Sequence, residues 1–371
     1  MSKTFAASTT LIGTMFGAGY LGIPYVVMKS GFLIGLFYLL FVFSLLTLVM
    51  LYLGEISLRT KTKHQLTGYA QKYLGKKGKI IMLISLVFGI YSAFVAYLIA
   101  EGDSFSYMIF NNTSYSLYLG IVFWAFLSFL SWKGLKALEE GESTGVTIAI
   151  ILAILIVVFT WNKIDVNNLT YVNWGNFFVP FGVIIFSFLG FSAVPTVHDI
   201  LGEERKLLKK VIWIAHIIPL IIYIFFTLAV LGFKGMGTPE IATLALGKPF
   251  VLLGMITMFT SYFSLSIALI NNFRLDFGFS KFKSWLITIS VPLVIFIILK
   301  IANIAGFVKI LSFGGIISGG LSVVLILLMI SRAKIKGNRN PEYSIPYSKI
   351  LIWFLILVFV LAVIMEVAGL V

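Results

Sequence analysis

Two apolar runs in this sequence are interrupted by glycine and proline, which would expose backbone groups able to bind ions. The first run contains IGTMFGAGYLGIPY at residues 12–25, with four glycines and one proline. Glycine costs a helix about 1 kcal/mol relative to alanine and proline lacks a backbone donor, so this run is predicted to unwind. Free N–H groups then attract a carboxylate, and free carbonyl groups attract a cation. Close helix packing is the alternative, because Gly13 and Gly17 also form a GxxxG motif.

The second interrupted run contains FSFLGFSAVPT at residues 186–196. It is the sixth apolar run of the chain, so it is expected to enter a membrane from the side opposite to the first. Interruptions at corresponding places of two inverted halves are typical of secondary transporters and lie at their central binding site. The two runs together therefore favour a transporter.

The elements that carry these runs are expected to be membrane helices. The 371-residue chain is 60% hydrophobic and 11% charged, with a mean hydropathy of +1.05, whereas a soluble domain is about 25% charged. A membrane helix needs about 20 apolar residues. Eleven runs meet this need, and we expect an all-α integral membrane protein. The runs are 5–28, 31–54, 80–108, 116–132, 143–161, 176–201, 211–233, 249–273, 285–303, 305–331 and 349–369.

The basic residues predict the orientation of these helices. If the N-terminus is cytoplasmic, 22 of the 28 Lys and Arg residues lie on the inner side of the membrane, as the positive-inside rule requires. We therefore expect a multi-pass protein of the cell membrane with its C-terminus outside. The net charge of +14 then reflects topology and anionic inner-leaflet lipid, and not binding to nucleic acid.

The composition argues against an enzyme. The sequence has no cysteine, and its three histidines, His64, His198 and His216, have no metal-ligand spacing such as HExxH. We expect no cofactor apart from a coupling ion. A channel would not need two broken helices, and a nutrient sensor would keep the same site, so a flux measurement separates it from a carrier.

Charged residues and loops give further expectations. Five carboxylates lie near predicted helix ends, where water is expected to reach them: Glu55, Glu101, Asp103, Asp199 and Glu366. Loop helices are predicted at 66–75 and from Pro239, each either a gate or an anchor at the membrane surface.

Four segments resemble the amino acid/auxin permease family and the related aromatic amino acid permeases. They are GTMFGAGYLGIPYVVMKSG at 13–31, YLIAEGD at 97–103, GFSAVPTV at 190–197, and Thr260-Ser261 followed by an apolar run to Asn271 and Asn272. The resemblance covers residues 5–331. It implies a leucine-transporter-like fold, a 5+5 inverted repeat with broken helices 1 and 6 that hold an amino acid. Domain boundaries follow: a core of 1–331 with repeats 5–161 and 176–331, then a cytoplasmic loop and eleventh helix at 332–371.

The resemblance also implies how an amino acid would bind. The backbone N–H groups of Gly17, Ala18 and Gly19 would hold its carboxylate. Backbone carbonyl groups would receive its amino group, those of Phe186, Ser187 and Leu189 and those near Thr14.

Aromatic side chains are expected around the same site. Those of Phe188, Phe191 and Tyr97 would shape the pocket, with simple packing or contact with lipid as the alternative. The chain departs from many relatives by having Phe191-Ser192 where they place a histidine. This departure leaves substrate preference and any proton role there open.

A coupling ion is expected next to the amino acid. The resemblance implies a Na⁺ site made by helix 1 carbonyl groups at Gly13 and Phe16 and by the hydroxyls of Thr260 and Ser261. Oxygen ligands suit a hard cation, although membrane Ser and Thr also bond to their own helix carbonyls. Some relatives replace this ion with a helix 5 lysine, and 143–161 contains none.

We therefore expect a Na⁺-coupled symporter of a small neutral amino acid that works by alternating access. The alternative is a proton-coupled carrier of the same fold that uses His198, the better candidate among the histidines, or a carboxylate as its proton relay. The partners expected are the amino acid and the lipid bilayer.

Overall fold

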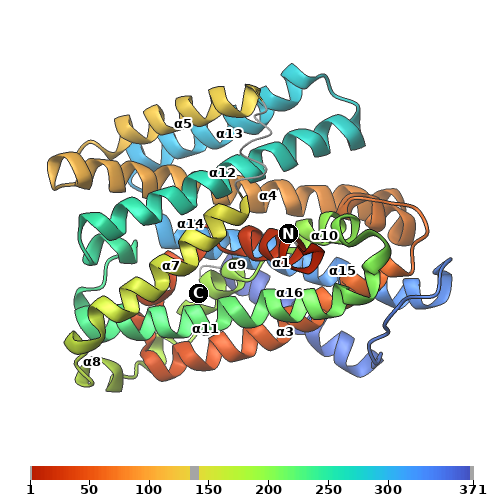
Figure 1. Cartoon of the computed structure of the whole chain (residues 1–371), viewed down its shortest axis with the longest axis horizontal. Coiled ribbons are helices and arrows are strands. Elements are labelled where there is room, and N and C mark those ends of the chain that lie inside the picture. The colour runs from red at the N-terminus through yellow and green to blue at the C-terminus, as the bar shows by residue number, and fades with distance from the viewer. Residues whose placement is uncertain (1, 134–141, 368–371) are drawn as a thin grey trace.

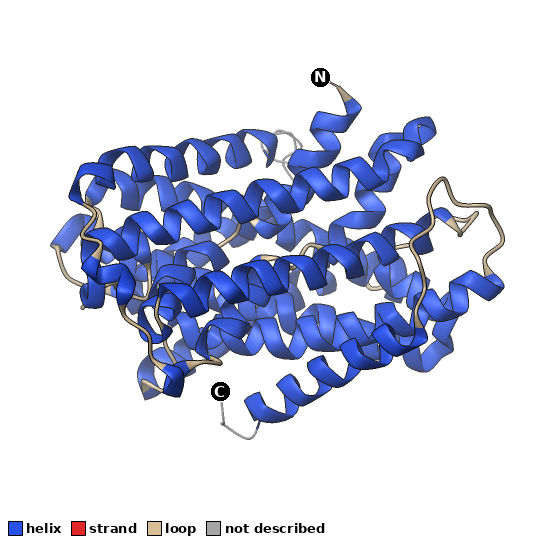
Figure 2. Cartoon of the chain, turned by 90° about the horizontal axis from the view of Figure 1, so that it is seen from below, coloured by secondary structure: helices blue, strands red, loops and turns tan. Residues whose placement is uncertain are grey.

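The computed structural model describes residues 2–133 and 142–367, and this part of the chain is helical without any strand (Figure 2). The all-α prediction is confirmed. The helices are α1 (Lys3–Met15), α2 (Gly19–Ser30), α3 (Phe32–Leu58), α4 (Leu66–Phe110), α5 (Ser116–Lys133), α7 (Glu142–Thr160), α8 (Asn167–Thr170), α9 (Val179–Ser187), α10 (Val194–Leu201), α11 (Leu208–Lys234), α12 (Lys248–Phe277), α13 (Lys281–Ala302), α14 (Phe307–Phe313), α15 (Gly320–Lys336) and α16 (Lys349–Val367).

The chain is a multi-pass membrane protein. Among the described residues, nine helical stretches are long and apolar enough to cross a membrane, and the bent pair α1–α2 passes the same test. One of the nine, Val179–Gly237, contains both the sixth and the seventh predicted runs. Helices therefore occupy all eleven predicted runs. The last two residues of the run 349–369 lie outside the described residues.

Both predicted interruptions are breaks between helices. The first separates α1 from α2, which are bent by 50° relative to each other. The second separates α9 from α10, with a short 3₁₀ turn, η3 (Phe191–Ala193), between them. Pro195 stands in the first turn of α10, where its missing N–H costs no hydrogen bond.

The broken helices lie in the middle of the molecule. Figure 1 shows α1 and α10 side by side at the centre, with α5 and α13 along one edge and α3 and α11 along the other. Unbroken helices therefore surround the free backbone groups, so that these groups face protein and not lipid.

Three local features differ from the sequence expectations. The loop helix predicted at 66–75 exists and forms the first part of α4. Non-helical backbone angles at Gly75 separate it from the rest of α4. The helix predicted from Pro239 is wrong: a 3₁₀ turn, η6 (Ala242–Ala245), forms instead. Glu240 accepts a hydrogen bond from the Val308 N–H at 3.2 Å, which uses its carboxylate at the start of α14. The tenth run contains a π-helix, η7 (Gly314–Gly319), which the sequence did not predict.

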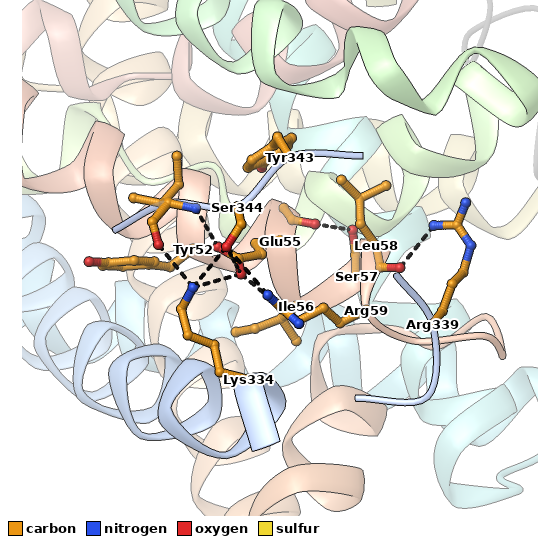
Figure 3. A network of polar contacts seen from close by, with 12 residues as sticks. Tyr52, Glu55, Ile56, Ser57, Leu58, Arg59, Lys334, Arg339, Tyr343 and Ser344 are labelled. Atoms are coloured by element: carbon orange, nitrogen blue, oxygen red, sulfur yellow. Dashed lines mark hydrogen bonds and ion pairs between the residues drawn. The ribbon is translucent and has the colours of Figure 1, made fainter. Parts of the chain in front are cut away.

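A polar network fixes the loop between α15 and α16 to the end of α3 (Figure 3). The Glu55 carboxylate accepts hydrogen bonds from Arg59 at 2.8 Å, Lys334 at 2.9 Å, Ser344 at 3.0 Å and the Ile345 N–H at 2.8 Å. Its side chain is fully buried. Water was expected to reach this carboxylate, and that expectation is wrong because the loop covers it.

Other contacts extend this network along the loop. Arg339 donates to the Leu58 carbonyl at 2.9 Å, and the Tyr343 hydroxyl donates to the Leu51 carbonyl at 2.8 Å. In addition, the Tyr52 hydroxyl donates to the Pro346 carbonyl at 2.9 Å. The loop therefore holds α3 and α15 together at the face of the molecule that carries Lys3 and the N-terminus, here called the N-terminal face.

Replacing Glu55 with alanine is expected to destabilise this face. The change leaves Arg59 and Lys334 without their shared buried partner, and breaking such a pair costs about 3 to 5 kcal/mol. A thermal unfolding scan of the purified protein should show a lower midpoint. Glu342→Gln is the matched control, because the Arg339–Glu342 pair is partly exposed and is worth about 1 kcal/mol or less. Equal midpoints for both variants would contradict a stabilising role for the network.

Candidate functional site

The two helix breaks are in direct contact. A Cβ atom on Gly19 would lie 2.7 Å from the Ser187 Oγ and 3.0 Å from the Ser187 Cα, so only glycine allows this approach. The buried Tyr223 hydroxyl of α11 lies 2.9 Å from the Ser187 carbonyl oxygen and 3.3 Å from that of Met15. Its single proton is shared between the ends of α9 and α1. Nothing in the sequence distinguishes Tyr223 from the other tyrosines that the structure buries.

The breaks leave complementary backbone groups around this contact. The last carbonyl groups of α1 and the first N–H groups of α2 have no partner within a helix, and α2 begins without a side-chain cap. The N-terminal end of α2 therefore has uncapped N–H groups at the place where the sequence predicts a carboxylate site, at Gly17, Ala18 and Gly19. The Phe186 and Ser187 carbonyl groups each accept one hydrogen bond already, and the second lone pair of each is left for an amino group.

A cavity of about 80 Å³ lies between the broken helices and α4. Six of the ten predicted substrate residues line it: Thr14, Gly17, Tyr97, Phe186, Leu189 and Phe191. Ala18, Gly19 and Ser187 lie beside it in the chain. Its other lining residues are Met15, Leu86, Gly89, Ile90, Ala93, Ser192, Leu265, Ser318 and Ser322.

Phe188 is the predicted substrate residue that the structure places away from this cavity. Its ring is fully buried and packs edge-on against Tyr223, with the centroids 5.2 Å apart, and it also stacks on His216. These contacts join α9 to α11. Phe188 therefore packs inside the protein, which was the alternative to a role in shaping the pocket. It follows the last turn of α9 and faces α11.

A larger cavity of about 420 Å³ adjoins the first and shares Thr14, Ser192 and Leu265 with it. Its wall follows α1, α10 and α12 through Thr10, Ile200 and Asn271 to the N-terminal face. The protein is therefore hollowed from the centre toward that face.

A third, water-sized cavity of about 10 Å³ brings together the four predicted ion ligands, Gly13, Phe16, Thr260 and Ser261. Four other residues complete its wall: Gly145, Val146, Thr257 and Ser264. Gly145 and Thr257 were not predicted from the sequence as part of this site. A Cβ atom on Gly145 would lie 2.8 Å from the Thr260 Oγ1, so this glycine lets α7 approach α12 closely.

Two hydroxyls of this cavity bond to carbonyl groups of their own helix, and Thr257 donates to the Gly254 carbonyl at 2.7 Å. Thr260 donates to the Thr257 carbonyl at 2.9 Å, which is the self-bonding alternative. A hydroxyl that donates in this way keeps its lone pairs for another partner. Self-bonding and cation binding by Thr260 are therefore compatible.

Tyr97 connects the two smaller cavities. Its hydroxyl has the Ala18 backbone and the Ser261 side chain as hydrogen-bonding neighbours, and a Cβ atom on Gly17 would overlap it. The side chain is buried, with 2% of its surface exposed. One hydroxyl thus contacts the start of α2, where the carboxylate is expected, and a predicted ion ligand.

His198 lies apart from these cavities. It is on α10 and buried, and it belongs to none of the three cavity walls. Its Nε2 has no hydrogen-bond partner among the described residues. The structure does not bring His198 to the predicted amino acid or ion site, so its proton role stays a prediction.

The fold and the two adjoining breaks define a leucine-transporter-like membrane carrier. The chain is similar in structure to MhsT in a crystal structure titled as a complex with L-phenylalanine, with a TM-score of 0.70 and 15% identity. This match covers 99% of the chain and 97% of the MhsT chain. It confirms the predicted fold.

The sequence identifies the family. Residues 1–366 match the tryptophan/tyrosine permease family, and the chain belongs to it. Glutamine transporter 2 of Aliivibrio fischeri is 22% identical over an alignment of 366 residues. This alignment covers 92% of this chain and 92% of the relative. Tyrosine-specific transport system 2 of Haemophilus influenzae is 28% identical over 249 residues, 62% of this chain and 58% of the relative.

The chain is therefore an amino acid transporter and not an enzyme, as expected. The resemblance to the amino acid/auxin permease family was wrong in detail. The motifs common to these permeases are those of the broken helices, and several families of one fold share them. They therefore identified an amino acid permease more reliably than the particular family.

Replacing Gly17 with alanine is expected to weaken amino acid binding. The new methyl group displaces the Tyr97 hydroxyl, and an overpacking cost of about 1 to 3 kcal/mol, if it falls on the bound state, corresponds to roughly 5- to 150-fold lower affinity. Equilibrium binding of a labelled amino acid measures the effect. Gly237→Ala is the control, because a Cβ atom there meets nothing within 4 Å. Wild-type affinity in a folded Gly17→Ala variant would contradict the carboxylate assignment.

Proposed function

We propose that this permease carries a small neutral amino acid into the cell together with Na⁺. The observation that supports the proposal most is the adjoining pair of small cavities at the helix breaks. One lies at free backbone N–H and carbonyl groups, and the other has carbonyl and hydroxyl oxygens in its wall. The two cavities are linked through Tyr97.

The wall of the substrate cavity favours a neutral side chain. Its lining residues include no charged side chain, and a charged substrate group buried there would have no counter-ion. The α-carboxylate would lie at the start of α2, and the amino group would lie at the carbonyl groups that end α1 and α9. The substrate side chain would then point toward Gly89 and Ala93 of α4. The volume of about 80 Å³ favours a small side chain.

The ion cavity favours Na⁺ because its wall offers only oxygen ligands. Hard cations prefer such ligands, and the cavity has room for about one small particle. α7 lines the cavity with Gly145 and Val146, so no lysine ammonium of this helix takes the place of the ion. A bound ion would hold α1 against α12, because its ligands come from both helices.

Alternating access would use the broken helices as moving parts. The cavity of about 420 Å³ leads from the centre to the N-terminal face, which the basic residues predict to be cytoplasmic. The conformation therefore corresponds to the release side of an inward cycle. By the resemblance, α1–α3 and α9–α11 would move as a bundle against the other helices.

A second candidate substrate is an aromatic amino acid. The family is described as tryptophan/tyrosine permeases, and Phe186 and Phe191 in the cavity wall offer rings for stacking. A larger side chain would need the wall at Gly89 and Ala93 of α4 to open, because Ser318 occupies the space beside Gly89. The proton-coupled carrier is the alternative for the ion.

Uptake of each of the twenty amino acids into proteoliposomes tests these proposals. The protein is given an inward Na⁺ gradient in one series and an inward proton gradient in another. We expect accumulation of small neutral amino acids with Na⁺. Accumulation of tyrosine and tryptophan alone would favour the second candidate, and accumulation with protons alone would overturn Na⁺ coupling. The absence of any uptake would contradict the carrier and favour a sensor.

Replacing Thr260 and Ser261 together with alanine is expected to raise the Na⁺ concentration needed for half-maximal uptake. Each hydroxyl lost from a charged partner weakens binding by about tenfold or more. Ser266→Ala is the control, because this buried hydroxyl bonds to the Tyr262 carbonyl at 2.7 Å and does not line the cavity. Unchanged Na⁺ dependence in the double variant would remove the proposed ion site.

A further inference from the structure

A groove of about 450 Å³ lies between α5 and α13, which form one edge of the molecule in Figure 1. Its lining residues belong to none of the three cavities described above. Five of the eight are aromatic: Trp124, Phe129, Trp132, Phe282 and Trp285. Phe129 and Phe282 are each more than half exposed, so the groove opens to the surroundings of the protein. Its volume lies within the range of about 300 to 1,000 Å³ that is common for ligand pockets.

Two tryptophans bridge the groove and hold its walls in place. Trp285 of α13 donates its indole N–H to the Ser128 carbonyl of α5 at 2.9 Å, and Trp124 of α5 donates to the Ile289 carbonyl of α13 at 2.9 Å. Trp132 packs on Trp285 with the ring centroids 5.2 Å apart. The walls are therefore ordered before anything binds, and a ligand loses little affinity to their ordering.

Two lysines lie on aromatic rings that line the groove. The Lys133 Nζ is 4.4 Å from the centre of the Phe129 ring, and the Lys281 Nζ of α13 is 4.8 Å from the centre of the Trp132 ring of α5. Both lysines are exposed, and neither forms an ion pair with a described residue. Neither α5 nor α13 contains an acidic residue. An ammonium group that lies on a ring keeps its hydrogen-bond donors for another partner.

The lysines lie where the groove meets a membrane surface. Lys133 is the last residue of α5 and Lys281 is the first residue of α13, and the basic residues predict that both lie on the inner side. From Trp124 to Trp132 the groove extends about 12 Å along α5, at 1.5 Å per residue. One leaflet contributes about 15 Å of hydrocarbon. The aromatic wall therefore covers most of the apolar depth of one leaflet, with positive charge at its surface end.

This arrangement fits an anionic phospholipid better than a second copy of the chain. A two-fold dimer joins the same surface of both copies, so it would bring Lys133 and Lys281 of the two copies together without an acidic partner on these helices. A phospholipid supplies an acyl chain for the aromatic wall and a phosphate for the two ammonium groups. A zwitterionic lipid also has a phosphate, but its own ammonium group opposes the lysines.

We propose that the groove between α5 and α13 is a binding site for one anionic phospholipid of the inner leaflet, with an acyl chain along the aromatic wall and the phosphate at Lys133 and Lys281. By the resemblance, α5 and α13 do not belong to the moving bundle, so the lipid stays bound throughout the transport cycle. It would fix the stationary helices in the leaflet while the broken helices move. This inference does not depend on the identity of the substrate or of the coupling ion.

Native mass spectrometry of the purified full-length protein in a neutral detergent tests the proposal. Phosphatidylglycerol and phosphatidylcholine with identical acyl chains are titrated separately, and the dissociation constant of the first bound lipid is measured. Each lysine near an anionic lipid contributes about fivefold to binding, so we expect phosphatidylglycerol to bind about 25-fold more tightly. Equal affinities for the two lipids would overturn the proposal.

A charge variant assigns this preference to the groove. Replacing Lys133 and Lys281 together with glutamine should bring the affinity for phosphatidylglycerol close to that for phosphatidylcholine. Lys76→Gln with Lys77→Gln is the matched control, because it removes two exposed lysines of α4 that are not at the groove, and it should keep the preference. A preference that persists without Lys133 and Lys281 would overturn the proposal.

A second variant fills the groove without changing its charge. Ala125 is exposed and lines the groove, so Ala125→Phe should weaken the binding of phosphatidylglycerol. Val122→Phe is the control, because Val122 is exposed on α5 but does not line the groove. Unchanged binding in Ala125→Phe would overturn the proposal. A protein dimer that Ala125→Phe dissociates would also overturn it, because a second copy would then occupy the groove.

Discussion

Unpaired backbone groups inside a membrane must find partners, and the two helix breaks of this protein are organised by that requirement. The Tyr223 hydroxyl lies within hydrogen-bonding distance of carbonyl oxygens at the ends of α1 and α9. Gly19 brings the start of α2 against Ser187, so that the two breaks meet at one place. The groups that remain free face small cavities. A zwitterion has the opposite charges in a comparable arrangement, so an amino acid bound here, as proposed, would offset the cost of breaking two helices.

The same constraint explains how substrate and ion would be coupled. Gly13 and Thr14 follow one another at the end of α1, and one lines the ion cavity while the other lines the substrate cavity. Tyr97 contacts the start of α2 and Ser261. Occupancy of either cavity therefore changes the surroundings of the other. The loop around Glu55 has a different role, because it fixes the N-terminal face where the large cavity opens.

Much of this arrangement was predictable from sequence. Glycine and proline placed both breaks correctly, and the breaks favoured a transporter. The particular fold, and the approach of Thr260 and Ser261 to Gly13 and Phe16, were implied by the family resemblance. The direction of individual side chains could not be predicted in this way. Phe188, for example, packs against Tyr223 and does not line the pocket. Burial of Glu101 and Glu55 was missed because hydropathy locates helix ends without showing which neighbours cover them.

The most direct test of the central claim is an experimental structure of the protein with a bound neutral amino acid. The account predicts density for the amino acid between the two breaks, with its carboxylate within hydrogen-bonding distance of the N–H groups of Gly17 to Gly19 and its amino group at the ends of α1 and α9. An amino acid bound elsewhere, or bound here with its carboxylate directed away from α2, would contradict it.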